Sequence, residues 1–263
     1  MTNTKIKFAN VEFTYAPANG RAVKALDNVN LDVAKDEFVS IVGPSGCGKS
    51  TLLYLLGGFL PLVQGEISVD GRKIAKPGPD RGIVFQHFAL FPWKTVRQNV
   101  LYGLERKSMD TAQRAELAQK YIDLVKLTGF EDSWPAQLSG GMKQRVAIAR
   151  TLVTDPDVLL MDEPFGALDA QNRGILQEEL LAIWGSTRKT VLFVTHDVHE
   201  AVLLSDRVVV MSARPGRIKK TLPIDLPRPR GPDVNRSPRF VDYCQEIWDL
   251  VREEALAASG VKT

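Results

Sequence analysis

The stretch that decides the fold is Gly43-Pro44-Ser45-Gly46-Cys47-Gly48-Lys49-Ser50, followed by Thr51. It matches the phosphate-binding pattern G-x-x-x-x-G-K-[ST] at every defined position. Residues 37–42 before it form a short apolar run typical of a buried strand, and residues 51–56 after it predict the start of an apolar helix. The motif requires this order of strand, loop and helix, so the sequence predicts an α/β fold.

The residue types in this loop suit a bound nucleotide. Gly46 and Gly48 let the backbone curl around a β-phosphate, and Lys49 neutralises the β and γ oxygens. The Ser50 hydroxyl is a magnesium ligand. We interpret Cys47 as a small space-filling residue rather than a catalytic one, and we expect alkylation of its thiol to block nucleotide entry.

A second phosphate-binding helix start follows at Leu138-Ser139-Gly140-Gly141-Met142-Lys143-Gln144-Arg145. The Ser-Gly-Gly turn leaves backbone N–H groups unobstructed, and a helix beginning near Met142 directs the positive end of its dipole toward an anion placed there. By itself the turn is equally compatible with an ordinary N-capped helix. A chain with two such starts belongs to a narrower class of nucleotide-hydrolysing folds than a chain with one.

Two adjacent carboxylates, Asp162 and Glu163, follow the apolar run 158–161. A run without alternation predicts a strand covered on both faces of a parallel sheet. Ligands of open α/β sheets bind at the carboxyl edge, so Asp162 is placed to hold magnesium through water and Glu163 to polarise the water that attacks a γ-phosphate. The alternative is a strand-terminal turn with solvated acids.

A third apolar run, residues 190–195, ends in His196. An imidazole at that edge can bond both a γ-phosphate and the attacking water, whereas a lone histidine at a strand end is usually a half-buried polar cap. The motif context favours the functional interpretation. We assign the other two histidines, His87 and His199, to solvated or packing positions.

Together these motifs resemble the ATP-binding-cassette ATPase, the nucleotide-hydrolysing subunit of an ABC transporter, from about Phe8 to about Ile218. The loop at 43–51 is similar to the family's Walker A, Asp162 and Glu163 to its Walker B, and residues 138–145 to its signature sequence. Residues 167–169 resemble the D-loop.

The resemblance also implies roles for single residues. Gln86, at the end of the predicted strand 82–85, is similar to the Q-loop glutamine, and His196 to the switch histidine. Tyr15 resembles the aromatic that stacks on adenine, although it shares a strand face with Val11 and Phe13, which is also compatible with a core position.

The implied catalytic residues are Glu163, His196 and Lys49, and the implied metal ligands are Ser50, Gln86 and Asp162. The implied ATP-binding residues are Tyr15, Gly43, Pro44, Ser45, Gly46, Cys47, Gly48, Lys49, Ser50, Thr51, Gln86, Ser139, Gly140 and Gly141. The expected ligands are therefore ATP and Mg²⁺.

The family's architecture accounts for the two phosphate-binding starts. In a head-to-tail homodimer each ATP lies between the Lys49 loop of one copy and Ser139-Gly140-Gly141 of the other, an arrangement that suits two-fold symmetry. The expected fold is a P-loop NTPase with a RecA-like core, an N-terminal antiparallel β subdomain and a helical insertion that carries the signature. The expected partners are multi-spanning permease subunits and, indirectly, a solute-binding protein, which places the chain peripherally at the cytoplasmic face of a membrane.

Composition agrees with this interpretation. The chain has 263 residues, 44% hydrophobic and 25% charged, which is ordinary for a folded domain, and its two cysteines make no disulfide framework. The first five residues show no apolar leader segment, and Gly57, Gly58 and Pro61 interrupt the apolar stretch 52–62. Any membrane-spanning segment of the system is therefore expected to belong to another chain. A formal net charge of +3 does not predict nucleic-acid binding.

We expect the ATPase domain to span residues 6–230, with the helical subdomain at about 87–155, and residues 231–263 to form a Pro/Arg-rich linker and an amphipathic helix. After Ile218 the proline-rich sequence is typical of a solvated, semi-rigid connector, with a lipid-headgroup contact as the alternative. The closing helix is predicted by apolar residues three and four positions apart: Phe240, Tyr243, Ile247, Leu250 and Val251.

Three stretches, residues 78–86, 91–93 and 214–218, are similar to the nitrate, sulfonate and taurine importer branch of the family, which implies uptake of a small anionic solute. Met142 departs from that branch, where glutamine is frequent. The alternative function is a soluble ABC-type ATPase clamp acting on DNA or ribosomes, which usually has a long coiled coil or two cassettes. A nucleotide-binding regulator without turnover is disfavoured by the intact Glu163 and His196.

Overall fold

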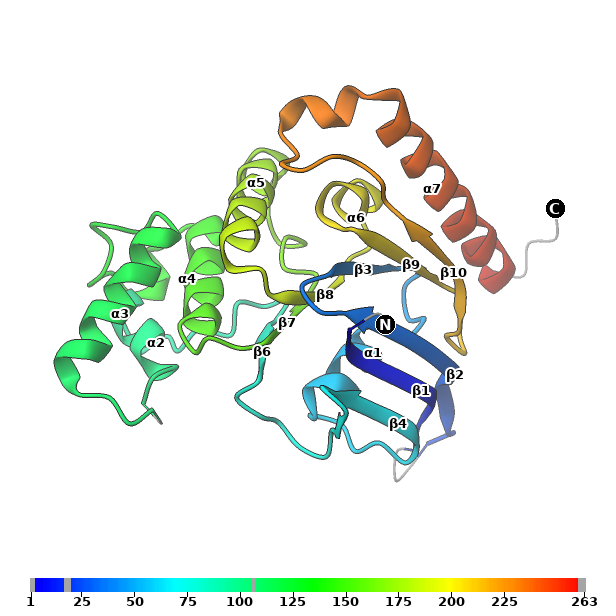
Figure 1. Ribbon diagram of the computed structural model, residues 1–263, viewed down its shortest axis with the longest axis horizontal. Helices are drawn as coiled ribbons and strands as arrows, with labels where there is room; N and C mark the ends of the chain where they lie inside the picture. Colours follow the sequence, from blue (N-terminus) through cyan, green and yellow to red (C-terminus); the bar gives the residue numbers. More distant parts are fainter. Residues whose placement is uncertain (1–2, 17–19, 106, 260–263) are drawn as a thin grey trace. The chain divides into compact units, whose positions relative to one another are not determined.

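The computed structural model describes residues 3–16, 20–105 and 107–259 (Figure 1). Met1 and Thr2, part of the N-terminal stretch searched for a leader, lie outside these ranges. The chain forms two compact units, one made of Met1–Gly78 with Arg188–Thr263 and the other of Pro79–Thr187. Within the described ranges, no helix combines the length and the apolar character needed to cross a membrane.

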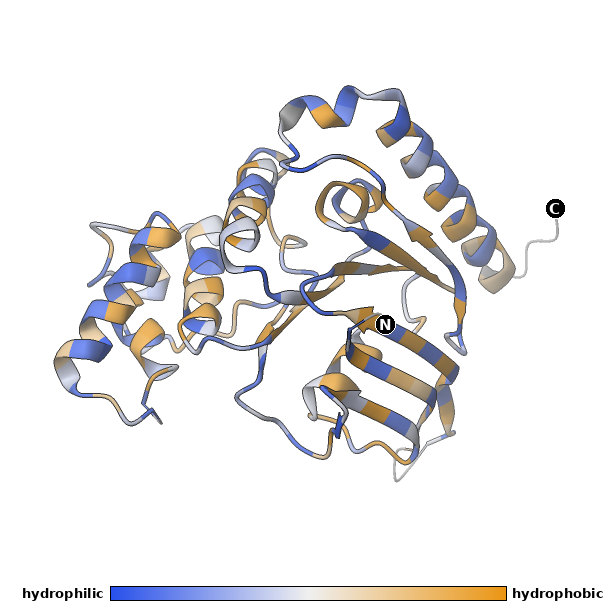
Figure 2. Cartoon of the chain, in the orientation of Figure 1, coloured by the Kyte–Doolittle hydropathy of each residue, from blue (hydrophilic) through white to orange (hydrophobic). Residues whose placement is uncertain are grey.

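The first unit contains an antiparallel sheet with the strand order β2-β1-β4-β5. Its strands are β1 (Thr4–Tyr15), β2 (Val23–Ala34), β4 (Gln64–Val69) and β5 (Arg72–Lys73). Figure 2 shows alternating hydrophilic and hydrophobic bands along β1, β2 and β4, as expected when one face of a sheet is buried. Asp70 and Gly71, with φ of 50° and 71°, form the turn between β4 and β5, and positive φ at both positions is typical of an Asp-Gly hairpin turn.

A second set of strands in this unit leads into the phosphate loop, which follows β3, and into His196, which follows β8. In the order β10-β9-β3-β8, the strands β9, β3 and β8 are parallel and β10 is antiparallel. Every residue of β3 and β8 is buried, as predicted for strands covered on both faces. The strands are β3 (Phe38–Val42), β8 (Thr190–Val194), β9 (Arg207–Met211) and β10 (Ile218–Pro223).

The helices of the first unit are α1 (Lys49–Gly57), α6 (Val198–Leu204), the 3₁₀ turn η2 (Pro232–Arg236) and α7 (Pro238–Ser259). The predicted closing helix is confirmed as α7, and the side chains of Phe240 and Ile247 are fully buried.

The expectation of a solvated connector after Ile218 was wrong for its first part. Residues 218–223 form β10, and Ile224 and Leu226 are buried. The Arg230 guanidinium is also buried and donates to the carbonyls of Val202, Leu203 and Ser205 at 2.9, 2.9 and 2.7 Å. These carbonyls end α6, where helix geometry leaves acceptors without intrahelical donors.

The second unit is largely helical around a pair of parallel strands, β6 and β7. The predicted helical insertion, about 87–155, lies in this unit. Asn99 fixes the start of that region, because its buried amide donates to the carbonyls of Phe91, Lys94 and Thr95. The elements are β6 (Arg81–Val84), α2 (Val96–Tyr102), α3 (Thr111–Leu124), η1 (Pro135–Gln137), α4 (Gly140–Leu152), β7 (Val158–Asp162) and α5 (Ala170–Thr187).

Candidate nucleotide-binding site

The phosphate loop, defined here as residues 43–51, joins β3 to α1 in the first unit. Gly46 and Gly48 have φ of 74° and 104°, a left-handed region that residues with a Cβ rarely adopt. A Cβ on Gly48 would also lie 2.9 Å from the Ala25 carbonyl oxygen. Both glycines are therefore required for the backbone to turn at this point.

Lys49, the first residue of α1, is 6% exposed. Its Nζ donates to the carbonyl oxygens of Gly43 at 2.9 Å and Pro44 at 3.1 Å. Both acceptors are neutral, so they hold the ammonium at the loop without cancelling its charge. A buried cation in a glycine-shaped backbone turn fits the phosphates of a nucleotide.

Cys47 is 1% exposed and packs inside the loop, with its Sγ 3.9 Å from the Lys49 Nζ. Burial raises the pKa of this thiol, and the nearby Lys49 charge opposes the shift only in part. The side chain is thus a buried thiol rather than an activated thiolate.

Tyr15, at the end of β1, is 42% exposed, whereas Val11 of the same strand is fully buried. Of the two alternatives, a core residue or an adenine-stacking residue, the exposure favours the second. The Tyr15 hydroxyl bonds the Thr51 Oγ1 at 3.1 Å, and its ring meets Phe13 edge-on at 4.9 Å. The aromatic ring is therefore fixed beside the phosphate loop.

His196 is exposed directly after the buried Thr195, where the chain leaves β8 for α6. Two side chains that the sequence analysis missed fix this turn. Thr195 donates to the buried Glu200 carboxylate at 2.7 Å, and Asp197 caps α6 by accepting from the Glu200 N–H at 3.2 Å. An acid three residues after an Asp cap was the available signal.

The other two histidines lie where the sequence analysis placed them. His87 is exposed, and His199 is an exposed residue of α6 whose ring contacts Phe240 at 5.1 Å.

In the second unit, Asp162 ends the buried strand β7 and is 3% exposed. Glu163 follows with φ of 44°, an uncommon value for a residue with a side chain and one that recurs at functional sites. The Gln86 Nε2 lies 3.4 Å from the Glu163 Oε2. The structure thus brings together the predicted catalytic glutamate and the predicted Q-loop glutamine at the carboxyl ends of β6 and β7.

The signature turn also lies in the second unit. Ser139 is the N-cap of α4 and accepts from the Met142 N–H at 3.3 Å. Gly140 and Gly141 begin the helix, and its first turn contains no acidic residue. The positive end of the α4 dipole is therefore not neutralised by a carboxylate of its own first turn, which suits an anion.

The donor set fits Mg²⁺ bound together with phosphates rather than a metal held by protein alone. Among the described residues, no cluster of three or more His, Cys, Asp or Glu side chains is suited to a metal ion. Mg²⁺ commonly takes one or two protein oxygens, completed by phosphate oxygens and water. The Ser50 hydroxyl in the first unit and the Asp162 carboxylate in the second are oxygen-bearing groups of that kind.

A glycine-shaped loop with a buried lysine, placed between a parallel strand and a helix, defines the class of P-loop nucleotide-binding proteins. Comparison with known proteins agrees: the family model "ABC transporter" matches residues 26–166. The chain belongs to the ABC transporter family of ATP-binding proteins.

Three relatives illustrate the similarity. An uncharacterised ABC transporter ATP-binding protein of Methanocaldococcus jannaschii is 56% identical over 90% of this chain and 88% of its own length. The nitrate import ATP-binding protein NrtD of Synechocystis is 49% identical over 88% of this chain and 89% of its own. The aliphatic sulfonates import ATP-binding protein SsuB of Bacillus cereus is 49% identical over 82% of this chain and 85% of its own.

A solved dimeric ATP-binding cassette in a post-hydrolysis state, bound to ADP and Pi, has a similar structure. Its TM-score is 0.74 at 34% identity, over 84% of this chain and 99% of the solved chain. The expected fold is thus confirmed as a P-loop NTPase fold of the ABC type. The chain is an ATPase, with ATP and Mg²⁺ as its ligands.

Proposed function

We propose that this chain is the ATP-hydrolysing subunit of an importer for a small anionic solute of the nitrate, sulfonate or taurine type. The observation that carries the proposal is the 49% identity shared with both a nitrate and an aliphatic sulfonate import protein. It acts as a homodimer at the cytoplasmic face of a membrane, with multi-spanning permease subunits. A separate solute-binding protein selects the cargo.

The roles of single residues follow from the motifs and their local geometry. Lys49 and the N–H groups of the phosphate loop bind the β- and γ-phosphates, and Tyr15 stacks on the adenine. Bound Mg²⁺, for which Ser50, Gln86 and Asp162 are the protein ligands, neutralises charge on the triphosphate.

Three further residues act on the attacking water. The Glu163 carboxylate accepts its proton. Gln86 orients that carboxylate, in keeping with the 3.4 Å contact between them. His196 holds the water toward the γ-phosphate, and the Thr195–Glu200 bond keeps the turn that carries His196 in place.

Each nucleotide also requires the signature turn of a second copy. Ser139, Gly140 and Gly141 of the partner copy offer a helix start with no acidic residue in its first turn. Loss of the γ-phosphate removes the charge that this turn binds, so hydrolysis releases the dimer contact. The helical subdomain, about 87–155, carries this change to the permease, and residues 6–230 form the ATPase domain, followed by a linker and helix at 231–263.

An exposed aromatic cluster in the helical subdomain supports a permease contact. Trp93 is 68% exposed and Tyr102 is 45% exposed, and both rings lie against Phe91, at 5.7 and 4.5 Å respectively. Lys94 and Arg150 add cation–π contacts at 5.5 Å. Exposed aromatic residues held by their neighbours are typical of protein–protein interfaces.

Co-purification and uptake test the function. The chain is expressed together with any permease and solute-binding protein encoded by neighbouring genes, purified from membranes and reconstituted in vesicles with internal ATP. Retention of the permease and ATP-dependent uptake of nitrate, an aliphatic sulfonate or taurine is the expected result. Association with ribosomes or DNA, without permease, contradicts it and supports the alternative of a soluble ABC-type clamp.

A further inference from the structure

The segment Ser212–Arg217, which we call the brace loop, lies directly against the phosphate loop within the first unit. The Arg214 Nε donates to the Gly46 carbonyl oxygen at 3.2 Å. A Cβ placed on Gly216 would lie 2.0 Å from the Cys47 carbonyl oxygen, so the two backbones are in close contact. A side-chain bond and a backbone contact thus join the brace loop to consecutive residues of the phosphate loop.

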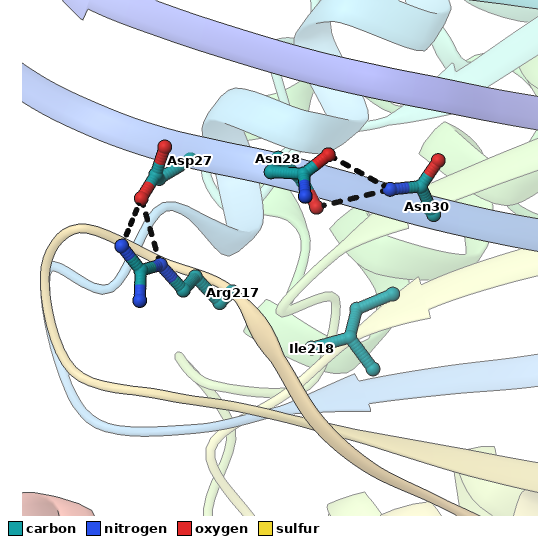
Figure 3. A pocket seen from close by; sticks show the side chains of 5 residues that line it. All are labelled: Asp27, Asn28, Asn30, Arg217 and Ile218. Carbon is teal, nitrogen blue, oxygen red and sulfur yellow. Dashed lines mark hydrogen bonds and ion pairs between the residues drawn. The ribbon is translucent and has the colours of Figure 1, made fainter.

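The brace loop is anchored to β2 on one side. The Gly216 N–H donates to the Ala25 carbonyl at 2.8 Å, and the Asp27 N–H donates to the Gly216 carbonyl at 3.0 Å. Figure 3 shows the second anchor, in which the Arg217 guanidinium makes two bonds to the Asp27 carboxylate, one of them from Nε at 2.7 Å. These contacts fix the end of the loop that follows Arg214.

Helix α7 anchors the other end. The Glu254 carboxylate accepts from the Ala213 N–H at 2.9 Å and from the Lys219 Nζ at 2.7 Å. Although partial burial alone would raise the pKa of Glu254, these two donors lower it, so the carboxylate is ionised at neutral pH. Its neighbour Glu253 is 70% exposed at its side chain and contacts only Lys219 among these groups.

We propose that Arg214 is a positioning residue for the phosphate loop, and that Glu254 of α7 holds the brace loop so that the C-terminal helix sets nucleotide affinity. In a planar trans peptide the carbonyl and the following N–H point in opposite directions. Binding of the Gly46 carbonyl by Arg214 therefore fixes the direction of the Cys47 N–H, which donates to the Pro44 carbonyl at 3.3 Å and so closes the turn of the phosphate loop. The proposal rests on the assignment of residues 43–51 as the phosphate loop.

Nucleotide titration of the purified full chain tests Arg214. Arg214→Ala is expected to raise the dissociation constant for MgADP about fivefold, the effect of losing one charge-assisted hydrogen bond at an exposed site. Because Arg214 acts through the backbone, the ratio to wild type should persist at high salt. A ratio that falls to one at high salt shows that Arg214 attracts the phosphates directly, and a change under twofold at low salt shows that it has no role; either result overturns the proposal.

The anchor on α7 has a matched control on the same helix. Glu254→Ala should weaken MgADP binding about threefold, while Glu253→Ala should leave it within about 1.5-fold. Glu254→Gln, which keeps an acceptor for the Ala213 N–H, should restore binding. The double variant Arg214→Ala with Glu254→Ala should be no weaker than Arg214→Ala alone, because both act through one contact. Additive effects, or equal effects of Glu253 and Glu254, contradict the proposal.

Gly216→Ala tests the backbone contact without changing any charge. The Gly216 backbone lies outside the left-handed region, so an alanine there is opposed by contacts alone. Its Cβ would lie 2.0 Å from the Cys47 carbonyl oxygen and 2.8 Å from the Met211 Cε, which is the end of a flexible side chain. The substitution should weaken MgADP binding at least as much as Arg214→Ala, whereas Gly185→Ala, in open space on α5, should not. Unchanged binding by Gly216→Ala in a folded protein overturns the close contact.

Two measurements distinguish failure of this inference from failure of the phosphate-loop assignment on which it rests. Unfolding midpoints of all variants establish that each protein is folded at the temperature of the titration. Lys49→Ala should abolish MgADP binding. If it does not, the phosphate-loop assignment fails; if it does while the Arg214, Gly216 and Glu254 variants bind normally, the inference about the brace loop fails alone.

Discussion

At the scale of single residues, the site depends on groups whose backbone is held in uncommon conformations. Gly46, Gly48 and Glu163 all have positive φ, and Glu163 is the only one of the three with a side chain. Strain of this kind costs on the order of 1–3 kcal/mol and persists only where surrounding structure enforces it. The end of the buried strand β7 provides that enforcement for Glu163.

Glu163→Gln should bind ATP normally but hydrolyse it about 10²- to 10⁴-fold more slowly, because an amide cannot accept the proton of the attacking water. The protein should accumulate as an ATP-bound dimer in size-exclusion chromatography. Glu178→Gln, which changes an exposed carboxylate of α5, is the matched control and should retain turnover. Unchanged hydrolysis by Glu163→Gln would remove Glu163 from the mechanism.

The two thiols should differ in their response to nucleotide. Burial, with a contribution from Asp197, raises the pKa of Cys244 from its ordinary value of 9.0 to about 12. This lowers its thiolate fraction at pH 8 by about 1,000-fold relative to the unfolded chain. Burial also raises the pKa of Cys47. Both should react slowly with iodoacetamide in the folded protein, as followed by mass spectrometry, and bound MgATP should slow Cys47 further while leaving Cys244 unchanged.

Protection of Cys244 as well as Cys47 would indicate a global change rather than occupancy of the phosphate loop. The sign of the pH effect follows from the raised pKa values. Above pH 9 the unfolded chain loses thiol protons that the folded chain keeps, so stability contributed by these thiols is lost as pH rises from 9 toward 12.

At the scale of elements, the sequence predicted the strands and helices that carry motifs, because their signals are local. Apolar runs followed by polar residues indicated the strands β3, β7 and β8. Ser139 followed by two glycines indicated the start of helix α4. The segment 218–230 was predicted wrongly, because its order depends on partners distant in sequence. Arg230 donates to the carbonyls of Val202, Leu203 and Ser205, and no local sequence pattern predicts contacts of this kind.

Arg230→Met should destabilise the protein by about 3 kcal/mol, because it leaves several buried carbonyls without donors. Burial, together with the neighbouring Arg228 charge, lowers the pKa of Arg230 to about 10, so the guanidinium remains charged at neutral pH. Arg239→Met, which removes an exposed ion pair to Asp225, should cost less than about 1 kcal/mol. Chemical denaturation of both variants measures the difference, and similar losses would contradict the capping role of Arg230.

At the scale of the whole molecule, the site residues are divided between the two units, and the family resemblance divides each ATP between two copies. The sequence indicated both the phosphate loop and the signature turn. The geometry of one copy does not identify the nucleotide that the signature turn binds. The inference that the signature turn binds the nucleotide of the other copy rests on the family resemblance alone. In the sequence, Arg214 indicated only a similarity to the importer branch. Its contact with Gly46 could not be predicted, because the two residues are 168 positions apart.

Mixing of two inactive variants tests the shared site. Lys49→Ala should not bind nucleotide, and Ser139→Arg should bind it nearly normally but lack turnover. In a mixed dimer one site carries both lesions and the other carries neither, so an equimolar mixture should regain up to about a quarter of wild-type ATPase activity. No recovery, with mixed dimers verified by differential tags, would show that the two motifs act on the same nucleotide within one copy.

Arg230 has a consequence for any shortened version of the protein. A stop codon after Leu226 leaves the ATP motifs in the sequence, yet it deletes the Arg230 cation that bridges the end of α6 to the segment following β10. The shortened protein should then expose apolar surface that is buried in the full chain, and cellular proteases should degrade this protein. A nonsense mutation this late in the gene should therefore abolish ATPase activity through loss of the protein rather than through loss of a catalytic residue.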